Sequence, residues 1–413
     1  MMNLRKAIIL ISLCCCFLSS VSLSENSDRP DNLTLSNFQF GPINRWSYSH
    51  IREVLPTVNI AHNNDQTLTL VKDEAFLGDF NIMHEGRVQS IDEIVREWYI
   101  DGLLILKDGN ILFEKYYDHL TEDKPHLMNS ISKSVVGLLA GKLEHDEFID
   151  FSQTVAHYIP ELAGSGWGPD SLQMILDMKD GSDYTEDYPD FSTTFRLQDC
   201  VVGWIEGDYC PENLPLGGYD FFPSIGRNEA NIGKFYYRSG STDVLGWVLE
   251  EATGESLPEL ISDYIWKPMG AEFDAFITVD ESGFALGSRG MNSTLRDLGR
   301  MGLLVINKGK AFGEQVVPAS FIEDMHDQLG DSTWPYESAD NLEPYYRSFW
   351  WGKGNEERDL SGVGIHGQFL RIAPEAGIVI ALYSSWPNAD GDKELQYWDQ
   401  SEDLLDAIIA KFR

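Results

Sequence analysis

The chain has 413 residues and a formal net charge of −35, with 66 acidic against 31 basic side chains. Such a surface repels the phosphates of nucleic acids and of anionic membranes, so the composition argues against nucleic-acid binding. The length suits one large domain with two lobes better than several independent domains.

The N-terminus has the pattern of a secretory signal peptide. Arg5 and Lys6 precede an apolar run that is too short to span a bilayer, and small residues around Ser24 offer a cleavage point. We therefore predict a signal peptide at 1–24, export to the periplasm or the extracellular space, and no membrane span in the mature chain. A retained anchor or a lipoprotein is the alternative, because cysteines lie within the run.

Once this peptide is removed, Cys200 and Cys210 are the two cysteines left of five. In an oxidising compartment a disulfide between them would contribute on the order of 2–3 kcal/mol to stability. Two buried free thiols are the alternative, because sequence spacing does not establish disulfide geometry.

The N-terminal part of the mature chain gives only a weak secondary-structure signal, and the first clear signal follows it. Residues 25–90 are rich in Asn, Ser and Asp, and we treat them as an N-terminal extension. Residues 102–118 predict a hairpin, because two apolar strands flank Asp108-Gly109, the dipeptide that tight hairpin turns prefer. Further along, we expect a helix that begins with an N-cap at Thr242 and ends at Gly254.

Strands return near the C-terminus, where residues 369–386 predict a second hairpin and residues 401–413 a capped amphipathic helix. Strands at both ends and helices in the middle favour an α+β fold, with an antiparallel β-sheet flanked by helices and an inserted, mostly α-helical lobe. We expect 91–149 and 286–413 to form the sheet lobe and 150–285 the helical lobe, with a cleft between them.

The sequence "SISK" places Ser130 three residues before Lys133, at the start of an apolar stretch. Residues three apart share one face of a helix, so the hydroxyl and the amine come within hydrogen-bonding reach. Burial favours the neutral amine, which could then take the serine proton and make the oxygen a nucleophile. The alternative is a helix N-cap serine followed by a solvated lysine, because the spacing by itself is common.

Two later stretches favour the catalytic interpretation. "YYRSGSTDVLGW" supplies Tyr237 and Ser239 at the start of a predicted helix, and "GVGIHG" supplies a glycine-rich start to a strand. A tyrosine beside the lysine could pass a proton to a leaving group. A strand edge could offer a backbone N–H to an oxyanion.

Together, the three stretches resemble the serine β-lactamase-like, penicillin-recognising hydrolases, and within them the branch of 6-aminohexanoate-dimer hydrolases and carboxylesterases. The resemblance covers residues 95–413, within a hydrolase domain that we place at 91–413, and it implies the fold described above. It also implies that Ser130 is the acylated nucleophile, Lys133 its general base and Tyr237 the acid/base that protonates the leaving group.

The resemblance extends to the oxyanion hole and the substrate contacts. The backbone N–H groups of Ser130 and Ile365 would form the oxyanion hole. The implied substrate-binding residues are Tyr188, Ser239, Gly364 and His366. Ser239 stands where many relatives have asparagine, and Tyr184 is the alternative to Tyr188 as the tyrosine that closes over substrate.

One departure from the family pattern concerns the substrate. Gly362-Val363-Gly364 replaces the Lys-Thr-Gly strand motif of lactamases and peptidases, so the cation that grips a β-lactam or peptide carboxylate is missing. We therefore expect hydrolysis of esters or short linear amides. β-Lactamase or DD-peptidase activity, or a non-catalytic penicillin-binding-like receptor, are the alternatives. His366 could replace the cation, although a single histidine in a strand is more often structural.

No cofactor or metal is predicted. "GVGIHG" matches a dinucleotide-binding pattern, but an apolar strand follows it where a helix is required. The nine histidines include no His-Glu-x-x-His pair, and no Gly-x-Ser-x-Gly elbow marks an α/β-hydrolase. The expected partner is a small-molecule ester or amide substrate.

Overall fold

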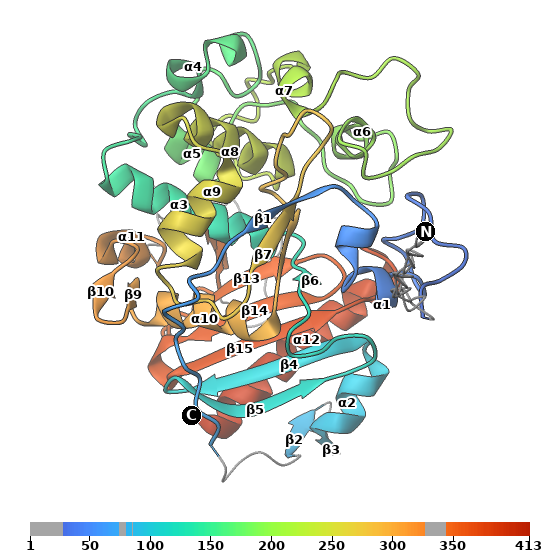
Figure 1. The fold of residues 1–413 in the computed structure, drawn as a ribbon, viewed down its shortest axis with the longest axis vertical. Coiled ribbons are helices and arrows are strands. Elements are labelled where there is room, and N and C mark those ends of the chain that lie inside the picture. Colours follow the sequence, from blue (N-terminus) through green and yellow to red (C-terminus); the bar gives the residue numbers. More distant parts are fainter. Residues whose placement is uncertain (1–27, 74–79, 85, 327–343) are drawn as a thin grey trace, which may run out of the picture.

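The computed structural model describes residues 28–73, 80–84, 86–326 and 344–413. A lobe built on a β-sheet and a lobe built of helices follow one another along the long axis (Figure 1). The predicted α+β fold class is confirmed. Within the described residues no helix is both long and apolar enough to cross a membrane, and the predicted signal peptide lies outside them.

The main sheet has seven antiparallel strands in the order β11-β12-β13-β14-β15-β4-β5. Their bounds are Ile100–Lys107 (β4), Asn110–Tyr116 (β5), Tyr345–Arg347 (β11), Trp350–Gly352 (β12), Leu360–Gly364 (β13), Gln368–Ala373 (β14) and Ile378–Ser384 (β15). Both predicted hairpins are present, as β4–β5 and β14–β15. Positive φ angles of 50° at Asp108 and 82° at Gly109 explain why this dipeptide makes the first turn.

Alternating side chains give the sheet two buried faces. Leu104 and Leu106 point into the core shared with α10 (Leu295–Ile306), whereas Leu103 and Ile105 pack in the core shared with α2 (Ile91–Glu97) and α12 (Asp392–Phe412). Helices α10 and α12 therefore cover opposite faces (Figure 1).

The C-terminal helix is longer than predicted. It begins at Asp392, well before the predicted start at residue 401. The sequence of the extra turns is strongly polar, which hides the helix. Tertiary contacts hold these turns, because Tyr397 packs on Trp386 and Trp398 packs on Phe369.

The helical lobe lies between the strands in the sequence. Its helices, with the helix that leads into it, are Ile131–His145 (α3), Val155–Tyr158 (α4), Leu172–Leu176 (α5), Thr194–Val201 (α6), Gly218–Phe221 (α7), Ser239–Thr253 (α8) and Leu257–Ile261 (α9). Helix α3 contacts both α8 and β13, so it joins the two lobes.

Helix α8 ends at Gly254 as predicted, but the predicted N-cap at Thr242 is wrong. The helix begins at Ser239, and Thr242 is buried inside its first turn. The reason is a cap from a distant loop: the carboxylate of Glu186 accepts a hydrogen bond of 2.5 Å from the Ser239 N–H. A cap that is supplied through the tertiary fold leaves no local sequence signal.

A second sheet connects the N-terminal segment to the centre of the molecule, in the order β1-β7-β8-β6. Its strands are Thr57–Ile60 (β1), His126–Leu127 (β6), Ala275–Thr278 (β7) and Met291–Ser293 (β8). The remaining elements are Asn44–Ser47 (α1), Asn81–His84 (β2), Arg87–Ser90 (β3), Lys310–Ala311 (β9), Glu314–Gln315 (β10) and Ala319–Asp324 (α11). Strand β1 thus places part of the predicted extension inside a sheet.

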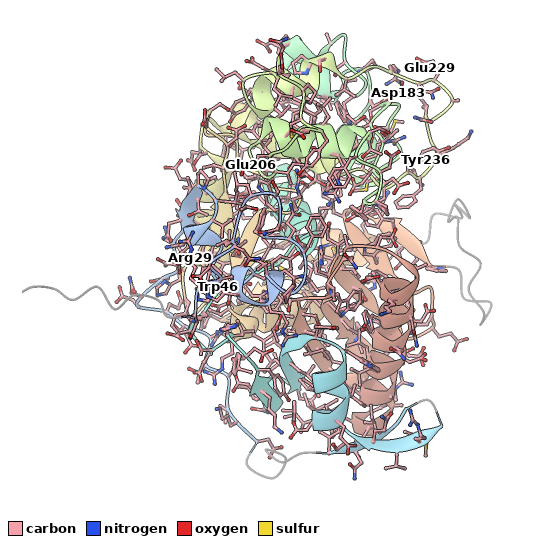
Figure 2. The ribbon with its side chains drawn as sticks, turned by 90° about the vertical axis from the view of Figure 1, so that its right-hand side faces the viewer. Arg29, Trp46, Asp183, Glu206, Glu229 and Tyr236 are labelled. Atoms are coloured by element: carbon pink, nitrogen blue, oxygen red, sulfur yellow. A yellow bond between two sulfur atoms is a disulfide. The ribbon has the colours of Figure 1, made fainter. Side chains whose placement is uncertain are left out.

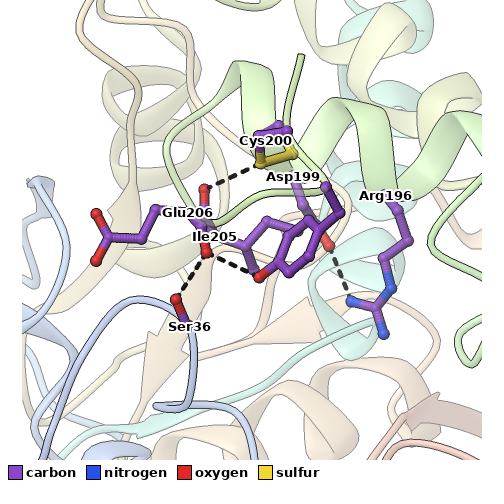
Figure 3. Close-up of a disulfide and its surroundings, with 8 residues drawn as sticks. Ser36, Arg196, Asp199, Cys200, Ile205 and Glu206 are labelled. Carbon is purple, nitrogen blue, oxygen red and sulfur yellow. Dashed lines mark hydrogen bonds and ion pairs between the residues drawn. A yellow bond between two sulfur atoms is a disulfide. The ribbon is translucent and has the colours of Figure 1, made fainter. Parts of the chain in front are cut away.

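The N-terminal segment, defined as residues 28–60, packs at the level where the lobes meet. Figure 2 shows Arg29 and Trp46 there, with the Arg29 guanidinium 6.0 Å from the Trp46 ring centroid. The segment also reaches the loop between Cys200 and Cys210, because the Ser36 hydroxyl donates to the Glu206 carbonyl oxygen at 2.7 Å (Figure 3). These two cysteines are disulfide-bonded, with their Cα atoms 5.6 Å apart, which resolves the choice that the sequence left open.

Candidate active site

Ser130 lies at the turn between β6 and α3. The preceding residue, Asn129, has a left-handed φ of 46°, a conformation that asparagine tolerates better than most residues. Ser130 occupies the N-cap position of α3, yet its hydroxyl makes no capping hydrogen bond. The hydroxyl instead accepts a hydrogen bond of 2.9 Å from Lys133 Nζ. The Ser130 side chain therefore does not cap the helix. Its oxygen faces the Lys133 amine, as the three-residue spacing predicts.

Lys133 is buried, with 1% of its surface exposed, and is held by three acceptors. Its Nζ donates to Ser130 Oγ at 2.9 Å, to Ser239 Oγ at 3.0 Å and to the Ser288 carbonyl oxygen at 2.9 Å. Burial lowers the pKa of Lys133 to about 8, although the carboxylates of Glu186 and Asp243 act in the opposite direction. Neutral amine is therefore accessible near neutral pH, as a general base requires.

Tyr237 completes the group around the serine. Lys133 Nζ lies 4.9 Å from the Tyr237 ring centroid. Burial raises the pKa of Tyr237 above its usual value and a nearby Glu186 carboxylate raises it further, while a hydrogen bond with the Ser130 side chain lowers it. The phenol is therefore a neutral O–H group beside the serine. Trp351 stacks on the ring with centroids 5.6 Å apart and fixes its plane.

Glu186 is the neighbour that the sequence did not single out. Besides capping α8, it accepts a hydrogen bond of 2.9 Å from the Ser239 hydroxyl, and the Tyr188 hydroxyl donates to the same carboxylate at 2.9 Å. The Glu186 carboxylate thus links Tyr188 to Ser239, and the Ser239 hydroxyl in turn contacts Lys133. The acidic loop "SDYTEDYPD" contains both Glu186 and Tyr188, but its several carboxylates give no sign of which one turns inward.

The end of β13 and the turn that follows it lie against the serine turn, so the predicted position of "GVGIHG" at the start of a strand is wrong. Asn129 Nδ2 donates to the Ile365 carbonyl oxygen at 2.9 Å. A Cβ atom on Gly364 would lie 2.7 Å from the Met128 carbonyl oxygen and 3.0 Å from the Ser130 backbone nitrogen, so a side chain does not fit there. This close approach brings together the two segments whose N–H groups were predicted to form an oxyanion hole.

Two of the residues considered from the sequence are buried and make their side-chain hydrogen bonds outside this group. His366 is 1% exposed, its Nδ1 is 2.7 Å from the Trp386 carbonyl oxygen, and burial lowers its pKa to about 4. It is neutral at physiological pH, so it does not replace the missing cation, and its burial argues against a substrate contact. Tyr184 is buried and donates to Gln198 Oε1 at 2.6 Å, which leaves Tyr188 as the better-placed tyrosine.

A buried ion network supports the lysine from behind. Asp243 accepts from the Ser288 N–H at 2.8 Å and from the Ser288 hydroxyl at 2.9 Å, which fixes the carbonyl group that Lys133 contacts. Arg289 pairs with Asp199 at 2.7 Å and lies 3.9 Å from Asp243. Because each charge has an oppositely charged neighbour, this network can stay ionised in the interior.

Other parts of the described chain are less suited to chemistry. No cluster of three or more His, Cys, Asp or Glu side chains there could hold a metal ion. A cavity of about 360 Å³ opens between the segment that follows α9 and the β9–β10 hairpin, lined by residues that include Lys142, Lys267 and Phe312. It shares no residue with the group around Ser130 and contains no serine, so we place the candidate site at Ser130.

The comparisons with known proteins show the family of the chain. The beta-lactamase family profile matches residues 101–402. A 6-aminohexanoate-dimer hydrolase from Paenarthrobacter ureafaciens is 34% identical over 393 residues, which cover 91% of this chain and 94% of that protein.

Solved structures show the same architecture. A Bacillus anthracis protein, provisionally described as a 6-aminohexanoate-dimer hydrolase, superposes with a TM-score of 0.79 at 28% identity, over 90% of this chain and 96% of its own. The hydrolase EstCE1, described as having promiscuous acyltransferase activity, has a TM-score of 0.56 at 16% identity, over 75% of this chain and 95% of its own, and supports the fold alone.

Proposed function

The chain belongs to the beta-lactamase family, and we propose that it is a serine hydrolase that cleaves esters or short linear amides through an acyl-enzyme on Ser130. The observation that carries this proposal is the contact between Ser130 and Lys133. A serine hydroxyl lies 2.9 Å from an amine whose pKa burial lowers to about 8. Such a pair is what activation of a serine nucleophile requires.

In the proposed acylation, neutral Lys133 takes the proton of Ser130, and Oγ attacks the substrate carbonyl carbon. The backbone N–H groups of Ser130 and Ile365 stabilise the negative oxygen that forms. The bond to the leaving group then breaks, and the Tyr237 hydroxyl delivers a proton to the departing alcohol or amine. Tyr237 regains its proton from Lys133, so the amine is neutral again when the acyl-enzyme has formed.

Deacylation reverses these roles. A water molecule gives a proton to Lys133 and attacks the acyl carbon, and the tetrahedral oxygen again faces the two backbone N–H groups. When the carbon–Oγ bond breaks, Lys133 returns the proton to Ser130. The products are a carboxylic acid and the restored serine.

The substrate class follows from charge. Gly362 stands where lactamases and peptidases have a lysine, and a Cβ atom there would lie 3.1 Å from Ser134 Oγ on α3. The position is therefore packed against a helix, and a side chain there would require Ser134 and Ile131 to move. Glu186 adds a negative charge beside Ser239. Both features disfavour a substrate carboxylate held at this strand position, the contact that lactamases and peptidases use, which supports esters and linear amides over β-lactams.

A substrate panel on wild type and Ser130→Ala tests the proposal. The panel contains p-nitrophenyl esters, a chromogenic cephalosporin and linear amide dimers, among them the 6-aminohexanoate dimer that gives the Paenarthrobacter relative its name. We expect turnover of esters or amide dimers to fall by at least about 10³-fold in Ser130→Ala, because removal of a catalytic nucleophile eliminates the acyl-enzyme route. Ser224→Ala, at an exposed serine of the helical lobe, is the matched control.

A covalent serine probe separates the enzyme from the receptor alternative. Mass spectrometry of the intact protein should show one fluorophosphonate adduct, which maps to Ser130. Hydrolysis that survives in Ser130→Ala would overturn the nucleophile assignment, and a wild-type protein without adduct or turnover would favour a binding protein.

We also propose that the protein is exported. The Cys200–Cys210 disulfide supports this, because disulfides persist in oxidising compartments. Identification of the N-terminal residue of the secreted or periplasmic protein by mass spectrometry tests the proposal. We expect cleavage near Ser24.

A further inference from the structure

The hydrogen bonds around Lys133 define a direction as well as a position. We propose that Glu186 is a positioning residue that acts through the Ser239 hydroxyl and directs the lone pair of neutral Lys133 toward Ser130. This inference rests on the proposed function, because it concerns the step in which Lys133 accepts the serine proton.

The argument begins with the proton of Ser239. A serine hydroxyl has one proton, and here it is donated to Glu186 Oε1 at 2.9 Å. The second carboxylate oxygen, Oε2, accepts a hydrogen bond of 2.5 Å from the Ser239 N–H. Glu186 is therefore held in place by both the backbone and the side chain of Ser239. Toward Lys133, 3.0 Å away, Ser239 Oγ can therefore only accept.

The remaining partners of Lys133 complete the count. The Ser288 carbonyl oxygen, 2.9 Å from Nζ, is also only an acceptor. A neutral amine has two N–H groups and one lone pair. The two obligate acceptors, Ser239 and Ser288, take the two N–H groups, so the lone pair is left for the third neighbour, Ser130. Ser130 alone can then donate its proton to the amine.

Charges on every side of Lys133 contribute to its titration. Glu186 from the loop before α6 and Asp243 from α8 favour the ammonium form, whereas Arg289 and burial oppose it. The neutral Tyr237 ring lies against the amine. Removal of the Glu186 charge should therefore move the acid limb of the kcat/KM profile to lower pH, apart from any effect on the direction of the lone pair.

The variant Glu186→Gln separates the effect of Glu186 on the direction of the Lys133 lone pair from the effect of its negative charge. A glutamine has one acceptor oxygen where Ser239 presents two donors, its N–H and its O–H. If the amide oxygen takes the N–H, the amide nitrogen donates to Ser239 Oγ, and the freed serine proton can then bond to the lone pair of Lys133 in competition with Ser130. We expect kcat to fall about tenfold or more, a part of the roughly 10²- to 10⁴-fold that general base catalysis contributes.

A matched control and a double variant make the test specific. Asp187→Asn removes the same charge from the neighbouring, exposed position of the same loop and should leave kcat unchanged. In Ser239→Ala no hydroxyl proton competes for Lys133, so addition of Glu186→Gln to that variant should lower kcat no further. The shift of the acid limb should persist in the double variant, because it depends on charge.

Several outcomes would overturn the inference. Thermal melting shows whether Glu186→Gln folds. If it does not, Ser239→Asn carries the test, because its amide keeps a donor for Glu186 and an acceptor for Lys133, and its kcat should exceed that of Ser239→Ala. The inference would be refuted if kcat were equal in Glu186→Gln and Asp187→Asn, or if Glu186→Gln lowered kcat equally with and without the Ser239 hydroxyl. It would also be refuted if kcat of Ser239→Asn did not exceed that of Ser239→Ala. Wild type without Ser130-dependent turnover would refute the proposed function itself.

Discussion

Burial decides the protonation state of Lys133, and this has a measurable consequence. Desolvation lowers the pKa of the amine to about 8, and Glu186 and Asp243 prevent a larger decrease. Only the neutral form accepts a proton from Ser130, and its fraction grows as the pH rises through the pKa. We therefore expect kcat/KM for an uncharged p-nitrophenyl ester to increase with pH along one ionisation near pH 8 and to level off above it.

The control for this pH dependence is Lys133→Arg. A guanidinium stays protonated at any pH at which the protein is folded, so it keeps the positive charge but cannot act as a base. We expect at least about 10²-fold lower kcat, the usual scale of general base catalysis, with no recovery at high pH. A wild-type profile that is flat across this pH region would contradict the role of Lys133.

At the residue scale, the sequence predicts contacts that one helix makes by itself. Ser130 and Lys133 meet because they are three residues apart on α3. Glu186 and Ser239 are 53 positions apart, and no local pattern links them. For His366 the resemblance implied a substrate contact, whereas a single histidine in a strand is more often structural, and its burial agrees with the structural role. Tyr48, from the N-terminal segment, packs edge-on against its ring and helps to bury it.

At the scale of elements, the distance between β13 and α3 controls the site, and Gly364 sets that distance. Gly364→Ala would place a Cβ atom 2.7 Å from the Met128 carbonyl oxygen and 3.0 Å from the Ser130 nitrogen. The strand must then move away from the serine turn, and we expect a loss of about 1–3 kcal/mol in unfolding free energy, as for other overpacked positions. Turnover should fall by at least about tenfold, because Ile365 would no longer lie beside Ser130.

Gly226→Ala is the matched variant for this comparison. A Cβ atom at Gly226 meets no atom within 4 Å, and the backbone there is not left-handed. Its unfolding free energy in urea and its kcat should stay close to wild type. If Gly364→Ala kept full activity, the proposed oxyanion hole at Ile365 would lose its main structural support.

Elements whose determinants are local are predicted well, and those fixed by tertiary contacts are not. The turn at Asp108-Gly109 is encoded by its two positive φ angles, so the β4–β5 hairpin is evident in the sequence. The start of α8 depends on the Glu186 carboxylate, and the first turns of α12 depend on aromatic packing against the sheet. The sequence near these two boundaries does not predict them, because segments that are distant in the sequence determine where each helix begins.

At the scale of the whole molecule, the N-terminal segment is part of the core. Strand β1 pairs with β7, and a third apolar cluster joins Phe38, Tyr48 and Ile51 to Leu127 and Phe276. Leu127 immediately precedes the Met128–Ser130 turn, and its N–H donates to the Tyr48 carbonyl oxygen at 2.8 Å. This segment, which belongs to the predicted N-terminal extension, therefore supports the strand that leads to the serine.

This arrangement predicts that residues 91–413 do not fold without residues 28–60. Each large apolar side chain removed from the core forfeits about 1.5–3 kcal/mol. Loss of Phe38, Tyr48, Ile51 and the β1–β7 pairing together approaches the whole stability of a typical domain, about 5–15 kcal/mol. We expect a chain that begins at residue 91 to be insoluble or to lack a cooperative thermal transition, whereas a chain that begins at residue 28 should melt cooperatively and carry the Ser130 adduct. A soluble 91–413 chain that reacts with the probe at the rate of the longer chain would show that the segment is dispensable, and the support for the serine strand would then have to come from β7 and β8 alone.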